Sequence, residues 1–250
     1  MRPFGFLLLV ILLPALAGCA TNGSRSGGDM ERASEINTEL GVAYMQEDNL
    51  NQAMDALTKA VDQNRRNPNA HSAIAVLYER LEQYDEAERH FRRALRLDGD
   101  NSSLRNNYGR FLCNRGDYED ADEQFRLALR NPLYERRELP LANAAVCAQQ
   151  AGNIDEAREY YRRSLEHDPE FTFVLRRMAE LQYDTEEYFS ARAYLQRYRD
   201  VASMDARMLW LGVRIERALG NDDDADSFGL RLRADFPDSD EASEYLRTRN

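Results

Sequence analysis

The chain has 250 residues, of which 43% are hydrophobic and 31% charged, and its formal net charge is -11. Proteins that neutralise nucleic-acid phosphates need clustered Lys and Arg, so this acidic balance argues against sequence-independent binding to DNA or RNA. A long apolar run occurs only at the N-terminus, which excludes a polytopic membrane protein. The high charge content, with only 13 Gly and 7 Pro, is typical of a soluble helical protein.

The N-terminus is typical of a bacterial secretory signal. Arg2 precedes an apolar stretch that Pro14 interrupts, and small residues follow. A short transmembrane anchor is the alternative, which the proline and the brevity of the stretch disfavour. Residues 16–19 read Leu-Ala-Gly-Cys and resemble the lipobox of bacterial lipoproteins, which implies a covalent lipid on Cys19. Ala20 rather than Asp follows the cysteine, and by resemblance to sorted lipoproteins this favours the outer membrane.

We therefore expect residues 1–18 to form a lipoprotein signal peptide and residues 19–33 to form a lipidated, flexible tether. The segment after Cys19 is rich in Gly and Ser and has no apolar periodicity. About 12 flexible residues reach roughly 20 Å on average, which is enough to hold a folded domain just off a bilayer. The specific function must then reside in the part of the chain that the tether holds.

The rest of the chain repeats with a period close to 34 residues. An apolar or aromatic residue stands three positions before five of six regularly spaced alanines, and a large residue stands four positions after five of them, the exception being Gly229. A small residue also stands twelve positions before five of them. Twelve positions before the sixth alanine stands Val213, and the small residue, Gly212, comes one position earlier. This predicts that the first helix of the sixth repeat is one residue longer. The six alanines are Ala53, Ala87, Ala121, Ala157, Ala191 and Ala225.

These offsets place the repeating residues on one helix face, where the small residues let two antiparallel helices approach closely. A 34-residue helix–turn–helix unit with this pattern is the tetratricopeptide repeat. The sequence therefore predicts an all-α, right-handed α-solenoid of six such repeats over residues 34–237, with a C-terminal capping helix and tail over 238–250. The predicted repeats are 34–67, 68–101, 102–137, 138–171, 172–205 and 206–237.

Two other architectures fit the pattern less well. A heptad coiled coil is disfavoured by the sustained long period and by its Gly and Pro punctuation. Two independent globular domains are disfavoured because repeats contact their neighbours continuously along the chain. The two-residue excess in the period falls in the Pro-bounded segment 131–140, which we expect to be a loop and the one candidate hinge.

No catalytic or metal-binding motif stands out. His71, His90 and His167 have no carboxylate or cysteine at metal-ligand spacing. The acidic run 222–224 lacks the spaced ligands and the glycine of an EF-hand. We therefore expect no enzyme, no small-molecule substrate and no cofactor other than the covalent lipid on Cys19.

Cys113 and Cys147 remain after the lipidated cysteine is set aside. A secreted chain meets an oxidising compartment, so the two thiols could form a disulfide. Both lie in the predicted first helices of consecutive repeats, which are neighbours in a solenoid. Two small buried side chains that pack between helices without bonding are the alternative.

Beyond the repeats, three segments carry a more specific resemblance. Residues 106–116 read Asn-Asn-Tyr-Gly-Arg-Phe-Leu-Cys-Asn-Arg-Gly, residues 132–134 read Pro-Leu-Tyr, and residues 143–147 read Asn-Ala-Ala-Val-Cys. With the lipidated N-terminus, this pattern resembles the type IV pilus biogenesis lipoproteins, the pilotin family called PilF or PilW. Ala145 departs from the pattern, where Gly is expected.

The resemblance implies an outer-membrane scaffold whose repeats face the periplasm and bind the type IV pilus secretin. Such a pilotin promotes the localisation and multimerisation of the secretin, and hence pilus biogenesis and twitching motility. A general periplasmic adaptor lipoprotein, which organises cell-wall hydrolases or outer-membrane assembly factors, is the alternative function. The anchor, the fold and the compartment are the same in both.

In this architecture, fixed positions of the first helices line a concave groove that grips a partner segment. Val42, Met45 and Val76 would form an apolar strip in that groove, with polar groups around it. The alternative is that these residues pack between repeats. The predicted groove residues are Thr38, Val42, Met45, Ser72, Val76, Glu79, Asn106 and Arg110.

Overall fold

A computed structural model describes residues 23–249, which form thirteen α-helices and no strand. The predicted all-α fold is therefore confirmed. The helices are α1 (Gly23–Gln46), α2 (Leu50–Gln63), α3 (Pro68–Arg80), α4 (Tyr84–Leu97), α5 (Ser102–Arg115), α6 (Tyr118–Ala128), α7 (Glu138–Gln150), α8 (Ile154–His167), α9 (Thr172–Asp184), α10 (Tyr188–Val201), α11 (Ala206–Ala218), α12 (Asp222–Asp235) and α13 (Asp240–Arg249).

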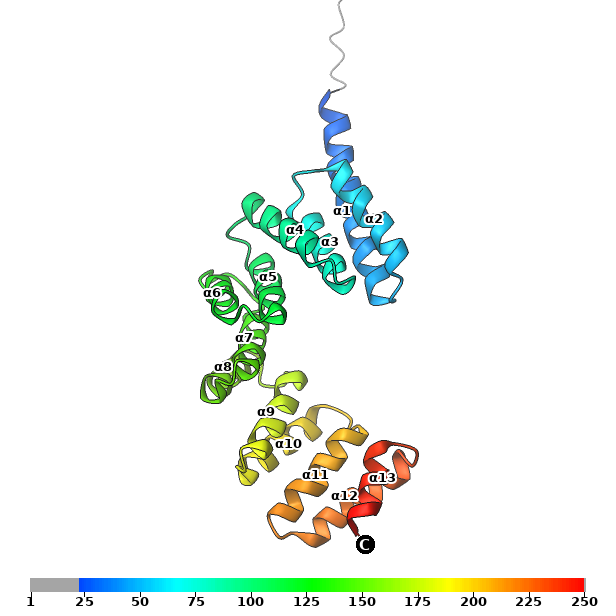
Figure 1. Ribbon diagram of the computed structural model, residues 1–250, viewed down its shortest axis with the longest axis vertical. Coiled ribbons are helices and arrows are strands. Elements are labelled where there is room, and N and C mark those ends of the chain that lie inside the picture. The colour runs from blue at the N-terminus through cyan, green and yellow to red at the C-terminus, as the bar shows by residue number, and fades with distance from the viewer. Residues whose placement is uncertain (1–22, 250) are drawn as a thin grey trace, which may run out of the picture.

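Helices α1 to α12 form six pairs, and each pair packs against the next. Figure 1 shows the pairs following one another along a curved path, with α1 and α2 at one end and α11 to α13 at the other. This is the α-solenoid of tetratricopeptide repeats that the period predicts. The two-residue excess lies in the loop between α6 and α7, but the loop ends at Arg137 and Pro140 already belongs to the first turn of α7.

The turn inside each helix pair contains one residue in the left-handed region of backbone conformation. Glycine occupies it in three pairs, at Gly116, Gly152 and Gly220, with φ of 86°, 83° and 76°. Glycine adopts this conformation without a steric penalty, so it ends the first helix of each of these pairs cleanly. The other three pairs use Asp48, Glu82 and Glu186 at φ of 58°, 58° and 62°.

Side-chain caps start several of the first helices. The Asn67 side chain accepts hydrogen bonds from the backbone N–H groups of Asn69 and Ala70, and Asn101 caps α5 in the same way. These bonds satisfy amide groups that have no partner within the helix. The caps therefore mark where one repeat ends and the next begins, at Pro68 and Ser102.

Small residues allow the paired helices to cross closely. All six periodic alanines are buried. A Cβ atom added to Gly109 would lie 2.8 Å from the Phe125 ring, and one added to Gly212 would lie 2.8 Å from the Phe228 ring. In the sixth repeat the two helices thus cross one residue earlier than the period predicts, at Gly212 and Phe228 instead of Val213 and Gly229. The predicted longer helix is wrong, because α11 has 13 residues, as do α3, α7 and α9.

Helix α13 closes the C-terminal end of the solenoid. The Ser239 hydroxyl accepts a hydrogen bond from the Ala242 N–H at 3.1 Å and caps the helix. Tyr245 is fully buried, and its ring lies against Gly229, the position at which the periodic pattern lacks a large residue. The capping helix therefore supplies the side chain that the sixth repeat does not.

The first helix begins earlier than the sequence predicts. Helix α1 starts at Gly23, so the part of the expected flexible tether from residue 23 to residue 33 is helical, and that prediction is corrected here. Residues 29–33 include good helix formers, which extend the helix toward the N-terminus from its predicted start at residue 34. Ser34 is buried and donates a hydrogen bond to the carbonyl oxygen of Ala60 at 2.8 Å, which ties this turn to α2.

Candidate protein-binding surfaces

Two of the three histidines lie together between α3 and α4. The Nδ1 atoms of His71 and His90 are 3.0 Å apart, and Nε2 of His71 is 3.1 Å from the carbonyl oxygen of Arg65. His71 therefore donates from Nε2 and accepts from His90 at Nδ1. Burial lowers the pKa of His90 to about 4, and His71 and Arg89 add to this effect. The pair is therefore neutral at pH 7. In residues 23–249 no group of three or more His, Cys, Asp or Glu side chains could hold a metal ion.

The predicted membrane anchor belongs to the N-terminal part of the chain. Cys19, the signal peptide 1–18 and the start of the tether lie outside the described residues. Among the helices from α1 to α13, none is long and apolar enough to cross a bilayer. Lipidation at Cys19 therefore stays a prediction.

Cys113 of α5 and Cys147 of α7 form a disulfide. Their Cα atoms are 5.6 Å apart, within the range that a disulfide spans. Helices α5 and α7 pack side by side as the first helices of consecutive repeats. The bridge predicted from the sequence is present in the structure, in the middle of the solenoid.

Four of the eight residues predicted to line an open groove are buried. Thr38, Met45, Ser72 and Asn106 are 8%, 6%, 4% and 7% exposed. Thr38 donates a hydrogen bond to the carbonyl oxygen of Ser34, and Met45 packs within the core of the first two repeats. The groove prediction is therefore corrected for these four. Their burial agrees with the alternative, packing between repeats, and not with an open groove.

Glu79 and Arg110 lie together where α3 meets α5. The Arg110 guanidinium donates two hydrogen bonds to the Glu79 carboxylate, at 3.3 and 2.7 Å, and Asn114 Nδ2 donates a third at 2.7 Å. The Glu79 side chain is only 10% exposed, and the positive charge of Arg110 compensates the charge of its carboxylate. Val42 and Val76 are half-buried and pack against the core of the first two repeats. Contact between these four groove residues and a partner stays a prediction.

One exposed apolar surface that the sequence patterns do not predict lies on α1. Ile36 and Leu40 are 55% and 40% exposed, and Ala43 is exposed as well. Spacings of four and three residues place all three on one side of the helix. We call this surface, made of Ile36, Leu40 and Ala43, the α1 face.

The α1 face is open because no helix pair precedes α1 in the described part of the chain. In later repeats the preceding pair covers the same positions. The buried counterparts of Ile36 are Ala70, Leu104, Val174 and Met208, and those of Leu40 are Ile74, Tyr108, Ala144 and Met178. The signal in the sequence is that the first repeat keeps large apolar residues at positions where a terminal, solvent-facing repeat would be polar.

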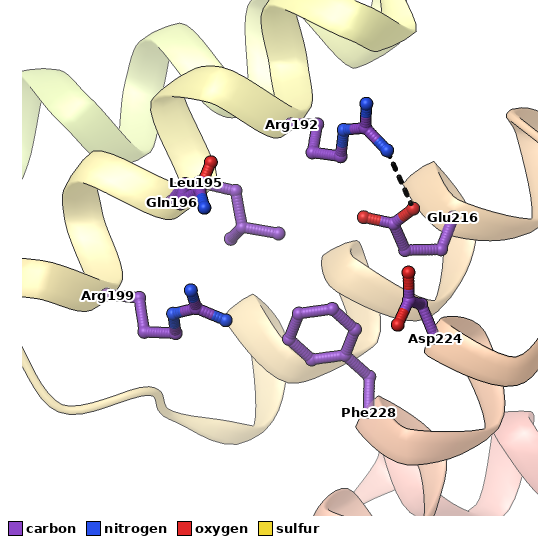
Figure 2. A pocket seen from close by; sticks show the side chains of 7 residues that line it. All are labelled: Arg192, Leu195, Gln196, Arg199, Glu216, Asp224 and Phe228. Atoms are coloured by element: carbon purple, nitrogen blue, oxygen red, sulfur yellow. Dashed lines mark ion pairs between the residues drawn. The ribbon is translucent and has the colours of Figure 1, made fainter. Parts of the chain in front are cut away.

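A pocket of about 360 Å³ opens between α10 and the pair α11 and α12. Figure 2 shows Arg192 and Arg199 on one side of it, Glu216 and Asp224 on the other, and the Phe228 ring between them. Arg192 and Glu216 form an ion pair across the pocket at 3.5 Å. Cationic and anionic groups therefore face one another, and the pocket favours no single ligand charge.

Comparisons with known families identify the repeats. Sequence models of the tetratricopeptide repeat match residues 34–67, 68–101, 90–123 and 148–211. These matches reach from the first predicted repeat into the sixth. The first two matches coincide with the end of α1 plus α2 and with the pair α3 and α4, whereas the other two are offset from the helix pairs.

Full-length relatives are more specific. The chain is 32% identical over 244 residues to the type IV pilus assembly protein PilF of Pseudomonas aeruginosa, and the match covers 95% of this chain and 96% of that protein. The solved structure of Pseudomonas aeruginosa PilF is 31% identical and superposes with a TM-score of 0.75, covering 88% of this chain and 99% of that one. PilW, a type IV pilus biogenesis factor, is also 31% identical, with a TM-score of 0.77 and coverage of 85% and 98%.

Proposed function

Because the chain belongs to the PilF/PilW family of tetratricopeptide-repeat proteins of type IV pilus biogenesis, we propose that it is the pilotin of the pilus secretin. A lipid on Cys19 anchors the protein in the outer membrane, and the solenoid faces the periplasm. The repeats bind an apolar segment of the secretin and bring its subunits to the membrane. The raised local concentration there promotes their multimerisation into the pore through which the pilus passes.

The α1 face is the observation that carries this proposal. Ile36 and Leu40 would be covered if another repeat preceded α1, so an apolar helix or strand of a partner can take that place. Burial of each large aliphatic side chain stabilises a complex by about 1.5–3 kcal/mol before ordering costs. Helix α1 is also the helix nearest in sequence to Cys19, so a secretin segment bound here is held close to the anchor.

A charge on the α1 face is expected to weaken secretin binding. Ile36→Asp and Leu40→Asp each place a carboxylate where the partner must exclude water, which should lower the affinity roughly 10- to 100-fold. Co-purification of the secretin from solubilised outer membranes, with quantification of its heat-stable multimers, measures the effect. We expect less secretin recovered and fewer multimers.

Leu230→Asp is the matched control, because Leu230 is 58% exposed on α12, at the far end of the solenoid. This variant should recover secretin normally. Circular dichroism and melting temperature must show that all three variants are folded. Normal secretin multimers with folded Ile36→Asp and Leu40→Asp would refute the assignment of the α1 face.

Loss of the lipid is expected to release the protein from the outer membrane. Cys19→Ser removes the only thiol in a lipobox context, so fractionation should find the variant in the soluble periplasm or in the inner membrane as uncleaved precursor. Ala20→Asp is the control that keeps the lipid, and its resemblance to retained lipoproteins places it in the inner membrane. Recovery of Cys19→Ser in the outer membrane at the wild-type level would contradict lipid anchoring.

A further inference from the structure

The last two repeats carry a basic and aromatic surface that the secretin proposal does not use. Its residues follow helical spacings of three and four on α9 and α11, two first helices that contact each other. We call this surface the α9–α11 face. It consists of Arg176, Glu180, Tyr183, Arg207, Trp210 and Arg214.

Arg214 is the centre of this face. Its guanidinium carbon lies over the Tyr183 ring at 4.6 Å from the centroid and over the Trp210 ring at 5.9 Å. All three residues are partly exposed. The two aromatic contacts orient the guanidinium without neutralising it, because the rings carry no net charge.

The other charges on the face are mostly compensated within the protein. Glu180 forms ion pairs with Arg207 at 3.0 Å and with Arg177 at 3.4 Å. The carboxylate of Asp205 lies 4.0 Å from Arg176. The face therefore carries more guanidinium groups than carboxylates, although the whole chain has a net charge of -11.

Arg214 differs from these arginines. Within residues 23–249 its guanidinium forms no hydrogen bond and no ion pair, and its Nε is buried without a hydrogen-bond partner. Because Nε is buried, a ligand reaches only the terminal Nη1 and Nη2 groups of Arg214, which form no hydrogen bond within these residues either. These groups are the donors that a carboxylate of a partner would use.

We propose that the α9–α11 face binds an acidic segment of a partner protein. A carboxylate of the segment accepts hydrogen bonds from Arg214, and an apolar or aromatic side chain beside it packs on Trp210. Charge-assisted hydrogen bonds to guanidinium are about twice as strong as neutral ones, and the aromatic contacts hold Arg214 ready for them. A long polyanion such as nucleic acid fits less well, because the acidic remainder of the chain repels it.

This inference goes beyond the proposed secretin function. The α9–α11 face lies in the last two repeats, whereas the α1 face is at the opposite end of the solenoid (Figure 1). Binding of an acidic segment requires neither the lipid nor the secretin. Failure of one proposal therefore leaves the other standing, and the variants that test them are different.

Trp210 provides a direct probe of this face, because it is the only tryptophan in the chain. The full chain in detergent is titrated with a synthetic peptide of about ten residues that alternates Asp or Glu with Leu and Phe. At ~3.3 Å per residue this peptide is about 33 Å long when extended, enough to cross two adjacent helices. We expect a saturable change in Trp210 emission that weakens with added salt. The same peptide with Asn and Gln in place of Asp and Glu should cause no saturable change.

Substitutions at Arg214 distinguish a specific site from general attraction. Arg214→Gln should weaken binding of the acidic peptide at least about tenfold, and Arg214→Lys, which keeps the charge, should weaken it less. Arg162→Gln is the control that removes the same charge from α8, where Arg162 is 59% exposed and ion-paired with Glu159. It should bind the peptide like the wild type. Melting temperatures confirm that the variants are folded.

Three results would overturn the proposal. Equal binding of the acidic and neutral peptides would show that charge does not matter at this face. Equal weakening by Arg214→Gln and Arg162→Gln would show that only the net charge of the chain matters. A Trp210 response to vesicles of anionic phospholipid, with none to the peptide, would assign the face to a membrane surface instead.

Discussion

Removal of the Cys113–Cys147 bridge is expected to lower the free energy of unfolding by about 3–4 kcal/mol. The two cysteines are 34 residues apart in sequence, and the bridge restricts the unfolded chain over that whole loop. In the folded state the bridge links α5 and α7, two first helices that pack against each other. The reduced protein should therefore keep its fold and lose stability.

Urea unfolding followed by circular dichroism measures this effect. The variant with both Cys113→Ala and Cys147→Ala should show a lower midpoint than the oxidised wild type and the same helix content. Reducing agent should shift the wild-type curve to that of the variant and leave the variant unchanged, which separates the disulfide from other actions of the reductant. Identical midpoints for oxidised wild type and variant would refute a stabilising role for the bridge.

Gly229→Ala is expected to displace the capping helix α13. A Cβ atom at this position would overlap the ring of Tyr245, which is fully buried and cannot move without leaving the core. Tyr245 also donates a hydrogen bond to Asp226 at 3.0 Å, which the displacement would break. Forcing an extra carbon into packed surroundings, or losing a large buried aromatic ring, costs about 1–5 kcal/mol.

Hydrogen exchange of α13 is the direct measurement, since its amides should lose protection before those of the other helices. The matched comparison is made in a Tyr245→Ala background, where the added Cβ meets no ring. There Gly229→Ala should be neutral or stabilising, because Ala favours a helix over Gly by about 1 kcal/mol. The same loss of stability in both backgrounds would mean that Tyr245 is not the neighbour that matters.

The sequence by itself determined the helix pairs and the number of repeats, and it identified Cys113 and Cys147 as the two cysteines that a bridge could join. A solenoid repeats the same contact between neighbours, so the residues that make it recur at a fixed interval that can be read along the chain. The bridge follows from the same rule, since Cys113 and Cys147 occupy neighbouring first helices. These features depend on contacts within a repeat or between adjacent repeats.

The tertiary structure decided which residues are accessible to a partner. Thr38 and Met45 are buried, whereas Ile36 and Leu40, at positions that are buried in later repeats, are exposed. Periodicity assigns equivalent positions the same surroundings, so it cannot show what happens where the periodic order stops. At the two ends of a solenoid a neighbour is missing or replaced, as Tyr245 of α13 replaces the large residue lacking at Gly229. Exposure there depends on which neighbouring helix is present, and that is a property of the folded chain.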